Sequence, residues 1–432
     1  MKNKFISLVL ILIFQITLIF TISKSQLLLP TLASNIVIEP GQSIQEAINN
    51  ASEGQTIYLK KGEYILTGDR GLEVNKTVTL LGECVNETII DGQGKITSIL
   101  SILADRAEIQ NLTIKNSETH GFGIHIRNVT NVKIQNCHIQ NCGQGIRLTN
   151  STHCEISRNL IANSRDYGIY FCIDSSYNTI FWNTIKNNSQ AISIEYEEYV
   201  YSRKNIFYQN NFIQNKIQTS GLGVPANLWN TTYPAGGNYW SDHTATDIRS
   251  GPYQNETGSD GIGDESYELP LGARDYHPTM GFIHCFFSYR CENIDYYTLV
   301  STNISDASCS NFHFNSNDAS INFTLTGTLE TGFCRVAIPK QLLRVDNNEW
   351  LVTINNNETE YTCMTDANYT YICFAYNYSN TQTIKIKGTH AIPEFPSITV
   401  ILLNLVIIIA LIILKITKNK CRTAHRSKFQ KT

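Results

Sequence analysis

Ile114-Lys115-Asn116 recurs as Ile139-Gln140-Asn141, Ile161-Ala162-Asn163, Ile185-Lys186-Asn187 and Ile213-Gln214-Asn215, so that successive asparagines lie 25, 22, 24 and 28 positions apart. A second series repeats at intervals of 22, 23 and 23: Gly123-Ile124-His125-Ile126, Gly145-Ile146-Arg147-Leu148, Gly168-Ile169-Tyr170-Phe171 and Ala191-Ile192-Ser193-Ile194. A repeat of this length indicates a solenoid. Because apolar β-branched residues alternate with period two, each turn should contain at least two short strands.

The fold predicted from these repeats is a parallel β-helix, in which equivalent residues of successive coils lie above one another. We expect the isoleucines to fill the core and the asparagines to form an inward ladder that bonds the backbone of each bend. The ladder residues are Asn116, Asn141, Asn163, Asn187 and Asn215. An asparagine-rich tract of low complexity is the alternative, but it would not keep isoleucine and asparagine in phase over five repeats.

Composition indicates a folded chain with room for more than one domain. Of 432 residues, 42% are hydrophobic and 16% are charged, and the formal net charge is -3. Outside the last eighteen residues there is no basic stripe with interleaved aromatic residues. The sequence therefore does not predict a nucleic-acid partner.

The two ends of the chain predict export and a membrane anchor. Residues 1–33 contain two early lysines and an apolar run, typical of a signal peptide, although an uncleaved N-terminal anchor is the alternative. After a linker at 391–397, the apolar stretch 398–416 is long enough for a transmembrane helix, and the basic tail 417–432 should stay cytoplasmic. We therefore expect a single-pass protein of the cell membrane whose bulk is extracellular.

Fourteen Asn-x-Ser/Thr sequons agree with an extracellular location and predict a glycoprotein. Residues 281–390 alternate aromatic and β-branched residues between turns, which predicts a small β-sandwich-like module. This cysteine-rich module holds an even set that suggests three disulfides; zinc is the alternative, although no CxxC pair occurs there. The six residues are Cys285, Cys291, Cys309, Cys334, Cys363 and Cys373.

Residues 36–235 begin with a capped amphipathic helix, Ser43-Ile44-Gln45-Glu46-Ala47-Ile48, and 236–280 form an Asp/Gly-rich closing segment. This arrangement resembles right-handed parallel β-helix proteins of the pectin-lyase-like kind. The segment Ile156-Ser157-Arg158-Asn159-Leu160-Ile161 is similar to the repeats of the NosD-type family. That family is grouped with carbohydrate-binding proteins and sugar hydrolases. Thr331-Gly332-Phe333-Cys334-Arg335 and Pro393-Glu394-Phe395-Pro396-Ser397 look like the module and C-terminal anchor of archaeal surface proteins. The resemblance implies an all-β solenoid with a carbohydrate-related role.

Alternation also predicts an external face. In the Gly-Ile-x-Ile strands the residue between the isoleucines points outward, so His125, Arg147, Tyr170 and Ser193 should stack on one face. Arginine binds carboxylates bidentately and aromatic rings offer flat surfaces to sugar rings. With His120 and Gln144 from nearby turns, this face suits a polysaccharide or a glycan of the cell envelope. An ordinary solvated face is the alternative.

Catalysis is the second hypothesis and a structural or adhesion stalk is the third. A polysaccharide lyase, epimerase or hydrolase would need close carboxylates or a base for proton abstraction. The sequence offers only scattered candidates, which are Arg165, Asp166 and Glu195. Enzymatic activity is therefore left open, with the balance against it.

Carboxylates around the turn Asp260-Gly261-Ile262-Gly263-Asp264 are candidate calcium ligands, because calcium prefers six to eight oxygen atoms. The expected ligands are Asp242, Asp247, Asp260 and Asp264, and simple turn geometry is the alternative. Copper is not predicted, since three methionines and scattered histidines form no cluster in the sequence.

Overall fold

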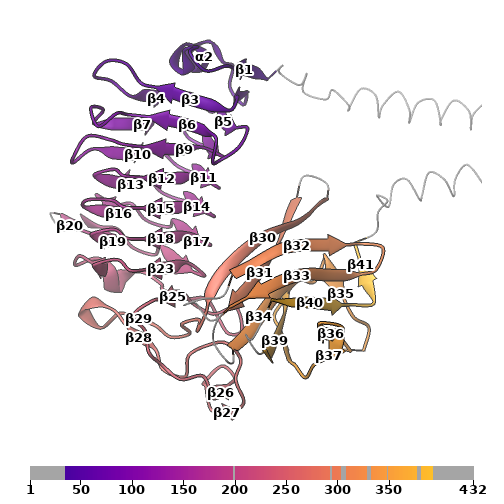
Figure 1. Cartoon of the computed structure of the whole chain (residues 1–432). Helices are drawn as coiled ribbons and strands as arrows, with labels where there is room; N and C mark the ends of the chain where they lie inside the picture. The colour runs from indigo at the N-terminus through magenta and orange to yellow at the C-terminus, as the bar shows by residue number, and fades with distance from the viewer. Residues whose placement is uncertain are drawn as a thin grey trace, which may run out of the picture. The chain divides into compact units, whose positions relative to one another are not determined.

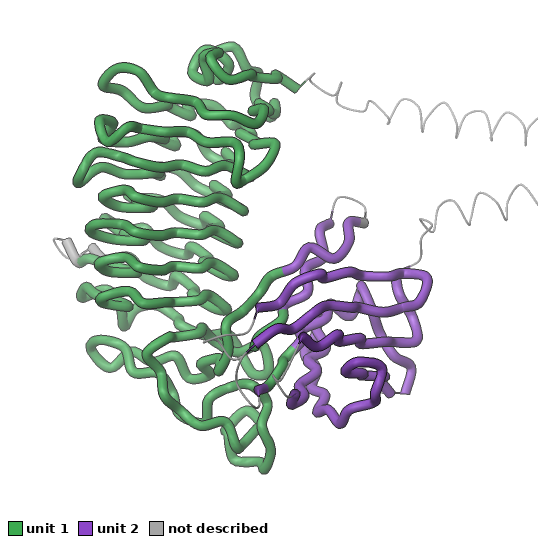
Figure 2. Tube along the Cα trace, in the orientation of Figure 1, with its two compact units in different colours: residues 1–285, 300–305, 333–335 green, residues 286–299, 306–332, 336–432 purple. Residues whose placement is uncertain are grey.

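The computed structural model describes residues 35–197, 200–291, 294–302, 308–327, 332–347, 349–376 and 381–392. The expected signal peptide, membrane span and basic tail lie outside these residues. The chain divides into two compact units, one of which extends to Cys285 and adds Val300–Ser305 and Phe333–Arg335 (Figure 2). In the described part of the chain, no helix is both long and apolar enough to cross a membrane.

The first unit is a parallel β-helix built from three sheets (Figure 1). One sheet contains β1 (Ile36–Ile38), β2 (Thr56–Leu59), β5 (Thr79–Gly82), β8 (Glu108–Gln110), β11 (Lys133–Gln135), β14 (Glu155–Ser157), β17 (Thr179–Phe181) and β22 (Ile206–Tyr208). The second contains β3 (Gly62–Ile65), β6 (Thr88–Asp91), β9 (Thr113–Lys115), β12 (His138–Gln140), β15 (Leu160–Ala162), β18 (Thr184–Lys186), β23 (Asn211–Ile213) and β25 (Tyr239–Trp240). The third, named sheet C, contains β4 (Leu72–Val74), β7 (Ser98–Ile102), β10 (Phe122–Arg127), β13 (Gln144–Thr149), β16 (Tyr167–Cys172), β19 (Gln190–Ile194) and β24 (Ile217–Ser220).

A short helix covers the N-terminal end of this solenoid, as the sequence predicts. Helix α2 (Ile44–Asn50) begins where the Ser43 side chain accepts a hydrogen bond from the Glu46 amide at 3.1 Å. Its apolar face buries Ile44, Ala47 and Ile48. This face shields the open end of the first coil, which would otherwise expose core side chains.

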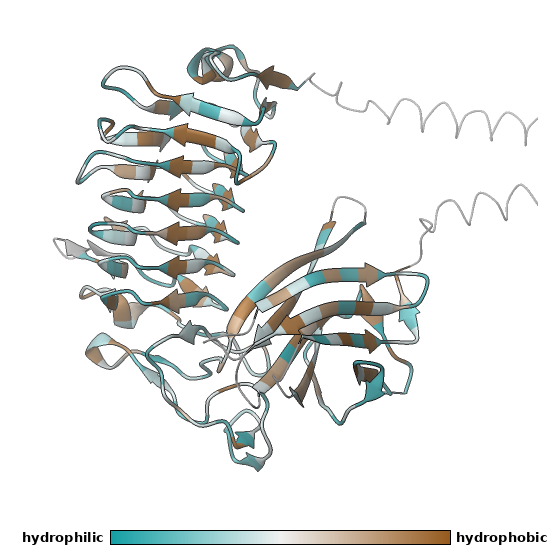
Figure 3. Cartoon of the chain, in the orientation of Figure 1, coloured by the Kyte–Doolittle hydropathy of each residue, from teal (hydrophilic) through white to brown (hydrophobic). Residues whose placement is uncertain are grey.

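The core consists of columns of aliphatic side chains in register. Ile114, Ile139, Ile161 and Ile185 lie opposite one another in β9, β12, β15 and β18, and all four are fully buried. Figure 3 shows hydrophobic residues recurring along the strands of successive coils. Each added coil buries the apolar side of the coil before it, so the hydrophobic effect stabilises the stack rather than any single turn.

The predicted inward ladder is wrong for four of its five asparagines. Asn116, Asn141, Asn163 and Asn187 have φ between 56° and 61°, and none of their side chains is buried. They occupy left-handed bends, a conformation that asparagine tolerates better than most residues. The repeat Ile-x-Asn therefore marks where each coil turns, and the side chain points away from the core.

Buried asparagine ladders do exist, but in other columns. In the longest column, each asparagine donates its backbone N–H and its side-chain Nδ2 to the Oδ1 of the asparagine in the next coil. From Asn159 to Asn183 these two bonds are 2.9 and 3.0 Å long, and from Asn183 to Asn210 they are 3.0 and 2.9 Å long. Asn210 donates likewise to Asn238. Two further columns link Asn178 with Asn205 and Asn227, and Asn188 with Asn215. Asn215 is thus the one ladder residue that was predicted correctly.

Cysteine residues occupy the earlier coils of the same columns. The Cys137 N–H donates to Asn159 Oδ1 at 2.9 Å, and the Cys154 N–H donates to Asn178 Oδ1 at 2.8 Å. Both side chains are buried, and burial raises the pKa of the Cys137 thiol to about 12. These thiols are packed core residues of the solenoid.

The C-terminal end is closed by aromatic stacking and one buried carboxylate. Phe207 stacks on Trp229 and Phe212 on Trp240, with ring centroids 4.3 and 4.2 Å apart. Asp275 ends the longest ladder, since its Oδ2 accepts from the Asn238 N–H at 2.7 Å. The smaller elements of the first unit are the β20–β21 hairpin (Tyr196–Glu197, Val200–Tyr201), η1 (Val224–Ala226), β26 (Arg249–Ser250), β27 (Glu256–Thr257), β28 (Tyr267–Glu268), η2 (Pro270–Gly272) and β29 (Arg274–Asp275).

After the solenoid, two five-stranded sheets follow. One contains β30 (Phe282–Cys291), β31 (Ile294–Thr302), β34 (Gly332–Pro339), β39 (Tyr369–Tyr376) and β38 (Thr362–Thr365). The other contains β32 (Ser308–Asn315), β33 (Ser320–Thr326), β40 (Gln382–Lys387), β36 (Leu351–Ile354) and β37 (Asn357–Glu358), and β35 (Leu343–Arg344) pairs with β41 (His390–Ala391). Pairs such as β33–β40 and β38–β39 are antiparallel, as expected for this module.

The predicted disulfides stay a prediction. Cys285, Cys309 and Cys363 carry free thiols in this structure. Cys363 lies opposite Ile372, and Cys373 lies opposite Thr362, in the β38–β39 pair. The two cysteines therefore point to opposite faces of the sheet, which argues against a bridge between them because side chains alternate along a strand.

Candidate functional site

The outward face of sheet C brings together the residues expected to bind a ligand. His125, Arg147 and Tyr170 lie opposite one another in β10, β13 and β16. All three side chains are partly exposed, as the alternation predicts. Ser193 continues the column in β19 but is fully buried, and its hydroxyl donates to Glu195 Oε1 at 3.2 Å.

Arg147 is held between two aromatic rings. Its guanidinium carbon lies 5.1 Å from the centroid of Phe122 and 5.1 Å from that of Tyr170. Its Nε donates to the Thr149 hydroxyl at 3.4 Å, and one terminal nitrogen contacts Cys172 Sγ at 3.5 Å. Cation–π contacts of this kind contribute about 0.5–1 kcal/mol each at exposed sites, so the guanidinium is preorganised while most of its five N–H donors remain available.

A tyrosine pair extends this platform. Tyr167 and Tyr170 lie three positions apart in β16, and their rings stack with centroids 4.7 Å apart and 13° between planes. Burial, followed by the nearby Glu195 and Asp166 carboxylates, raises the pKa of Tyr167. Both phenols therefore stay protonated near neutral pH and can donate hydrogen bonds to a ligand.

His125 lies beside the arginine and is kept neutral. Its Nε2 and the Thr149 hydroxyl are 3.0 Å apart, and its ring contacts Phe122 with centroids 5.1 Å apart. Burial, then the charges of Arg147 and Arg127, lower the pKa of His125 to about 4. The positive charge on this face is consequently supplied by arginine and not by His125.

Gln144 occupies the neighbouring outward column, between Phe122 and Tyr167 in register. The side chain is 8% exposed, and in the described part of the chain its Oε1 has no hydrogen-bond partner. A buried acceptor without a partner is unfavourable by about 1–3 kcal/mol. A hydroxyl group that reached this oxygen from the face would remove that penalty.

At the edge of sheet C, two further residues that the sequence suggested for the site lie in contact. His120 Nδ1 and Asp166 Oδ2 are 3.0 Å apart, although the residues are 46 positions apart in sequence. The His120 side chain is 81% exposed and that of Asp166 is 29% exposed. Since the pair faces solvent, it is accessible to a ligand at the edge.

Next to this pair lies a polar groove of about 480 Å³. Its walls include Asn116, Asn141 and Asn163, the outward asparagines of the left-handed bends, together with Gln93 and Arg165. Asn163 Nδ2 donates to Asn141 Oδ1 at 3.3 Å. Amide groups in a row can bond sugar hydroxyls, and Arg165 places a positive charge at one end.

Sequence reasoning missed Phe122, Tyr167 and this groove. Strict alternation did not signal them, because Phe122 and Tyr167 lie three positions before His125 and Tyr170 and would point to the opposite face of a regular strand. In the structure the two residues between them are buried and both ends are partly exposed, so the alternation is interrupted at this point of β10 and β16. The asparagine groove was missed because those residues were assigned to the core. Together the groove, the His120–Asp166 edge and the aromatic platform form what we call the candidate face.

The four aspartates expected to bind calcium do not converge. No group of three or more His, Cys, Asp or Glu side chains within the described ranges could hold a metal ion. Asp247 accepts from the Gly261 N–H at 2.9 Å, Asp264 from the Arg249 N–H at 3.0 Å, and Asp242 from the Tyr267 hydroxyl at 3.1 Å. Asp260 accepts from the Ile262 N–H at 3.0 Å. These carboxylates order their turns locally, and calcium binding by them stays a prediction.

Comparison with known proteins agrees with the fold class. The family model described as the right-handed β-helix region matches residues 85–242. A search of the curated proteins finds no match. The parallel stacking seen in the structure thus has its counterpart in a known type of solenoid.

Solved structures with a similar fold are distant in sequence. The pectate lyase Bsp165PelA from Bacillus sp. N165, solved with trigalacturonate, is 15% identical over 52% of this chain and 80% of its own, with a TM-score of 0.31. The alginate lyase from Paenibacillus sp. str. FPU-7 is 13% identical over 48% of this chain and 98% of its own, with a TM-score of 0.27. A pectin methylesterase in complex with hexasaccharide VII is 14% identical over 56% and 84%, with a TM-score of 0.25. At these values the likeness concerns the general fold and carries no argument about activity.

Proposed function

We propose that this protein binds an acidic polysaccharide along the candidate face. The observation that carries the proposal is Arg147, whose guanidinium carbon lies 5.1 Å from the centroids of both the Phe122 and the Tyr170 rings on the outward side of sheet C. A sugar ring can stack on the tyrosine pair while its carboxylate bonds the guanidinium. Arg165 at the groove adds a second positive charge for the next acidic unit.

The length of the face favours a polymer over a single sugar. Adjacent strands of a sheet lie about 4.8 Å apart, so three strands from β10 to β16 span roughly 10 Å between the outer two. That span corresponds to about two sugar rings. Stacked rungs offer similar groups at a regular interval, which suits a ligand that is itself a repeat.

The test is retention of the full-length protein on a panel of acidic and neutral glycans, with polymer cleavage read in the same wells. We expect retention on an acidic polymer, weakened about tenfold by Arg147→Gln and by a similar factor in Tyr170→Ala. Because both substitutions remove the cation–π contact between these residues, the unfolding temperature should fall by about 2–4 °C, which leaves the protein folded in the assay. Lys204→Gln is the matched control, because this lysine lies in another part of the solenoid against Tyr177. Retention that survives both face substitutions would refute the proposal.

Cleavage of the polysaccharide is a second candidate, favoured by the His120–Asp166 contact. A carboxylate that orients an imidazole is a common arrangement for a general base. For a lyase, the base would take the C5 proton of a uronate, a C4–C5 double bond would form as the C4–O bond breaks, and the departing oxygen would take up a proton from water to become a hydroxyl. New unsaturated ends that disappear in Asp166→Asn would support this candidate, whereas binding without cleavage would leave the face as a binding surface. Absence of both binding and cleavage would favour the stalk hypothesis.

We further propose a cell-surface location, single-pass, with the C-terminal tail in the cytoplasm. The proposal is supported by the sequence: the apolar stretch 398–416 with its basic tail, the sequons, and the resemblance to NosD-type proteins with the archaeal C-terminal anchor. The binding assays are run with and without calcium, because the aspartates of the closing segment are its predicted ligands. The location is tested by protease treatment of intact cells, which should remove the solenoid while the tail stays protected.

A further inference from the structure

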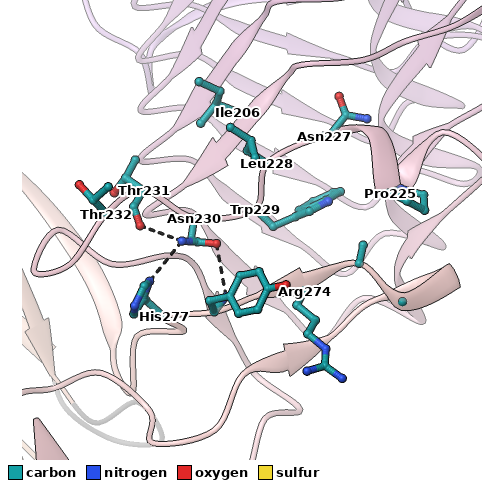
Figure 4. Close-up of a pocket in the computed structure, with 13 residues that line it drawn as sticks. Ile206, Pro225, Asn227, Leu228, Trp229, Asn230, Thr231, Thr232, Arg274 and His277 are labelled. Carbon is teal, nitrogen blue, oxygen red and sulfur yellow. Dashed lines mark hydrogen bonds between the residues drawn. The ribbon is translucent and has the colours of Figure 1, made fainter. Parts of the chain in front are cut away.

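A second cavity lies at the C-terminal end of the solenoid, away from the candidate face. It has a volume of about 710 Å³ and is bounded by β22, by the segment after η1 and by the returning segment 272–277 (Figure 4). Binding sites for small molecules usually have volumes of about 300–1,000 Å³. The size is therefore sufficient for one or two sugar rings.

Apolar side chains form one part of its wall. Leu228 is 58% exposed and Tyr276 is 60% exposed, which is unusual for large hydrophobic residues so close to one another. Ile206 adds to this surface, since it pairs with Leu228 in a parallel bridge. A flat apolar surface beside a tyrosine ring suits the face of a sugar ring.

The polar part of the wall is held in place by its own hydrogen bonds. Asn230 Nδ2 donates to the Thr231 carbonyl at 2.8 Å, and Asn230 Oδ1 accepts from the Tyr276 N–H at 3.3 Å (Figure 4). His277 Nε2 lies 3.3 Å from the Pro252 carbonyl, and its Nδ1 lies 3.2 Å from Asn230 Nδ2. A carbonyl only accepts and Nδ2 only donates, so this pattern assigns a neutral imidazole with the proton on Nε2.

Arg274 supplies the charge of the cavity. Among the described residues that line it there is no Asp or Glu, and Arg274 is the sole Lys or Arg. One of its terminal nitrogens pairs with Glu268 Oε1 at 2.9 Å, with side chains 46% and 62% exposed. An exposed pair of this kind is weak, so the guanidinium can exchange it for a ligand carboxylate.

We propose that this cavity binds one acidic sugar ring of the uronate class, with the ring against Leu228 and Tyr276 and the carboxylate on Arg274. Thr231 and Thr232 also line the cavity. The Thr231 hydroxyl donates to the Gly236 carbonyl at 2.9 Å, so it can accept a hydrogen bond from a ring hydroxyl. The site is separate from the candidate face and does not rest on the proposed function. A free uronate and the end of a uronate polymer share this chemistry.

The test is a calorimetric titration of the full-length protein with galacturonate, with glucose and with a galacturonate oligomer. We expect a dissociation constant on the order of 1 mM for galacturonate, and at least tenfold weaker binding of glucose. Arg274→Gln should weaken galacturonate at least about tenfold, and Tyr276→Ala about fivefold. Tyr253→Ala, at a residue that is 85% exposed and lies outside the cavity, should have no effect.

Glu268→Gln separates ligand binding from a structural role of the salt bridge. It removes the competitor of the ligand carboxylate, so affinity should stay equal or rise about threefold, whereas Arg274→Gln lowers it. Equal losses in both variants would overturn the proposal, as would equal binding of glucose. Arg147→Gln distinguishes the two sites: loss of galacturonate binding in that variant, with binding kept in Arg274→Gln, would overturn the proposal and place the uronate on the candidate face. Tighter binding of the oligomer than of the monomer would identify a polymer end as the ligand.

Discussion

Substitution of one ladder asparagine tests how the solenoid is stabilised. In Asn183→Ala, the buried Asn159 N–H loses its acceptor at 2.9 Å, and the Ile156 carbonyl loses a donor at 2.7 Å. Each buried group left without a partner costs about 1–3 kcal/mol. The free energy of unfolding should therefore fall by about 4 kcal/mol. With a slope of about 3 kcal/mol per molar urea, the unfolding midpoint should shift by about 1.3 M.

Urea unfolding followed by circular dichroism measures this shift, and amide hydrogen exchange at Asn159 gives a second readout. Asn187→Gly is the matched control, because Asn187 has φ of 56° and an exposed side chain, and glycine keeps that bend. Its effect should stay within about 0.5 kcal/mol. If Asn183→Ala shifted the midpoint no more than Asn187→Gly does, the buried columns would not be the stabilising ladder and our reasoning would fail.

Three further predictions concern the closing segment and the candidate face. Burial raises the pKa of Asp275 to about 7 in the folded protein, above the ordinary value of an aspartate. The stability that Asp275 contributes is therefore full below about pH 4 and falls as the pH rises to about 7. The difference in unfolding free energy between wild type and Asp275→Asn should be larger at pH 5 than at pH 7.5. Gly237→Ala places a methyl group 1.9 Å from Asp275 Oδ1, so the free energy of unfolding in urea should fall by at least about 2 kcal/mol. In the control Gly263→Ala the nearest atom to the new methyl group, Met280 Sδ, is 3.1 Å away, and the free energy of unfolding should fall by less. Because the pKa of His125 is lowered to about 4, its ring resonances should not titrate between pH 5.5 and 8 in NMR spectra, and a midpoint near 6.5 would contradict the burial of this ring.

The repeat of one coil per 22–28 residues could be predicted from the sequence, because side chains alternate along a strand and equivalent strands of successive coils stack. Ile114, Ile139, Ile161 and Ile185 form a buried column, and His125, Arg147 and Tyr170 share an outward column, both as expected. Period two decides inside from outside within a strand. It does not decide the orientation of a residue in a bend, where φ and not alternation sets the direction of the side chain.

The bends are where prediction failed. Asn187 and Asn188 are adjacent and chemically identical, yet Asn187 takes the exposed left-handed position and Asn188 the buried ladder position. Asparagine suits both roles, since it tolerates positive φ and its amide can both donate and accept. Only the surrounding coils, which supply Ser164 N–H and Asn215 Oδ1 as partners of Asn188, distinguish the two.

By itself the sequence determined the β-helix, its capping helix and the polar, aromatic face of sheet C, because local periodicity specifies those features. Tertiary structure alone decided three others. It joined His120 to Asp166 across two coils, placed Arg147 between Phe122 and Tyr170, and ended the asparagine ladder on Asp275. Each depends on the stacking register and on bends of unequal length, which are set by the packing of the whole solenoid and not by any one repeat.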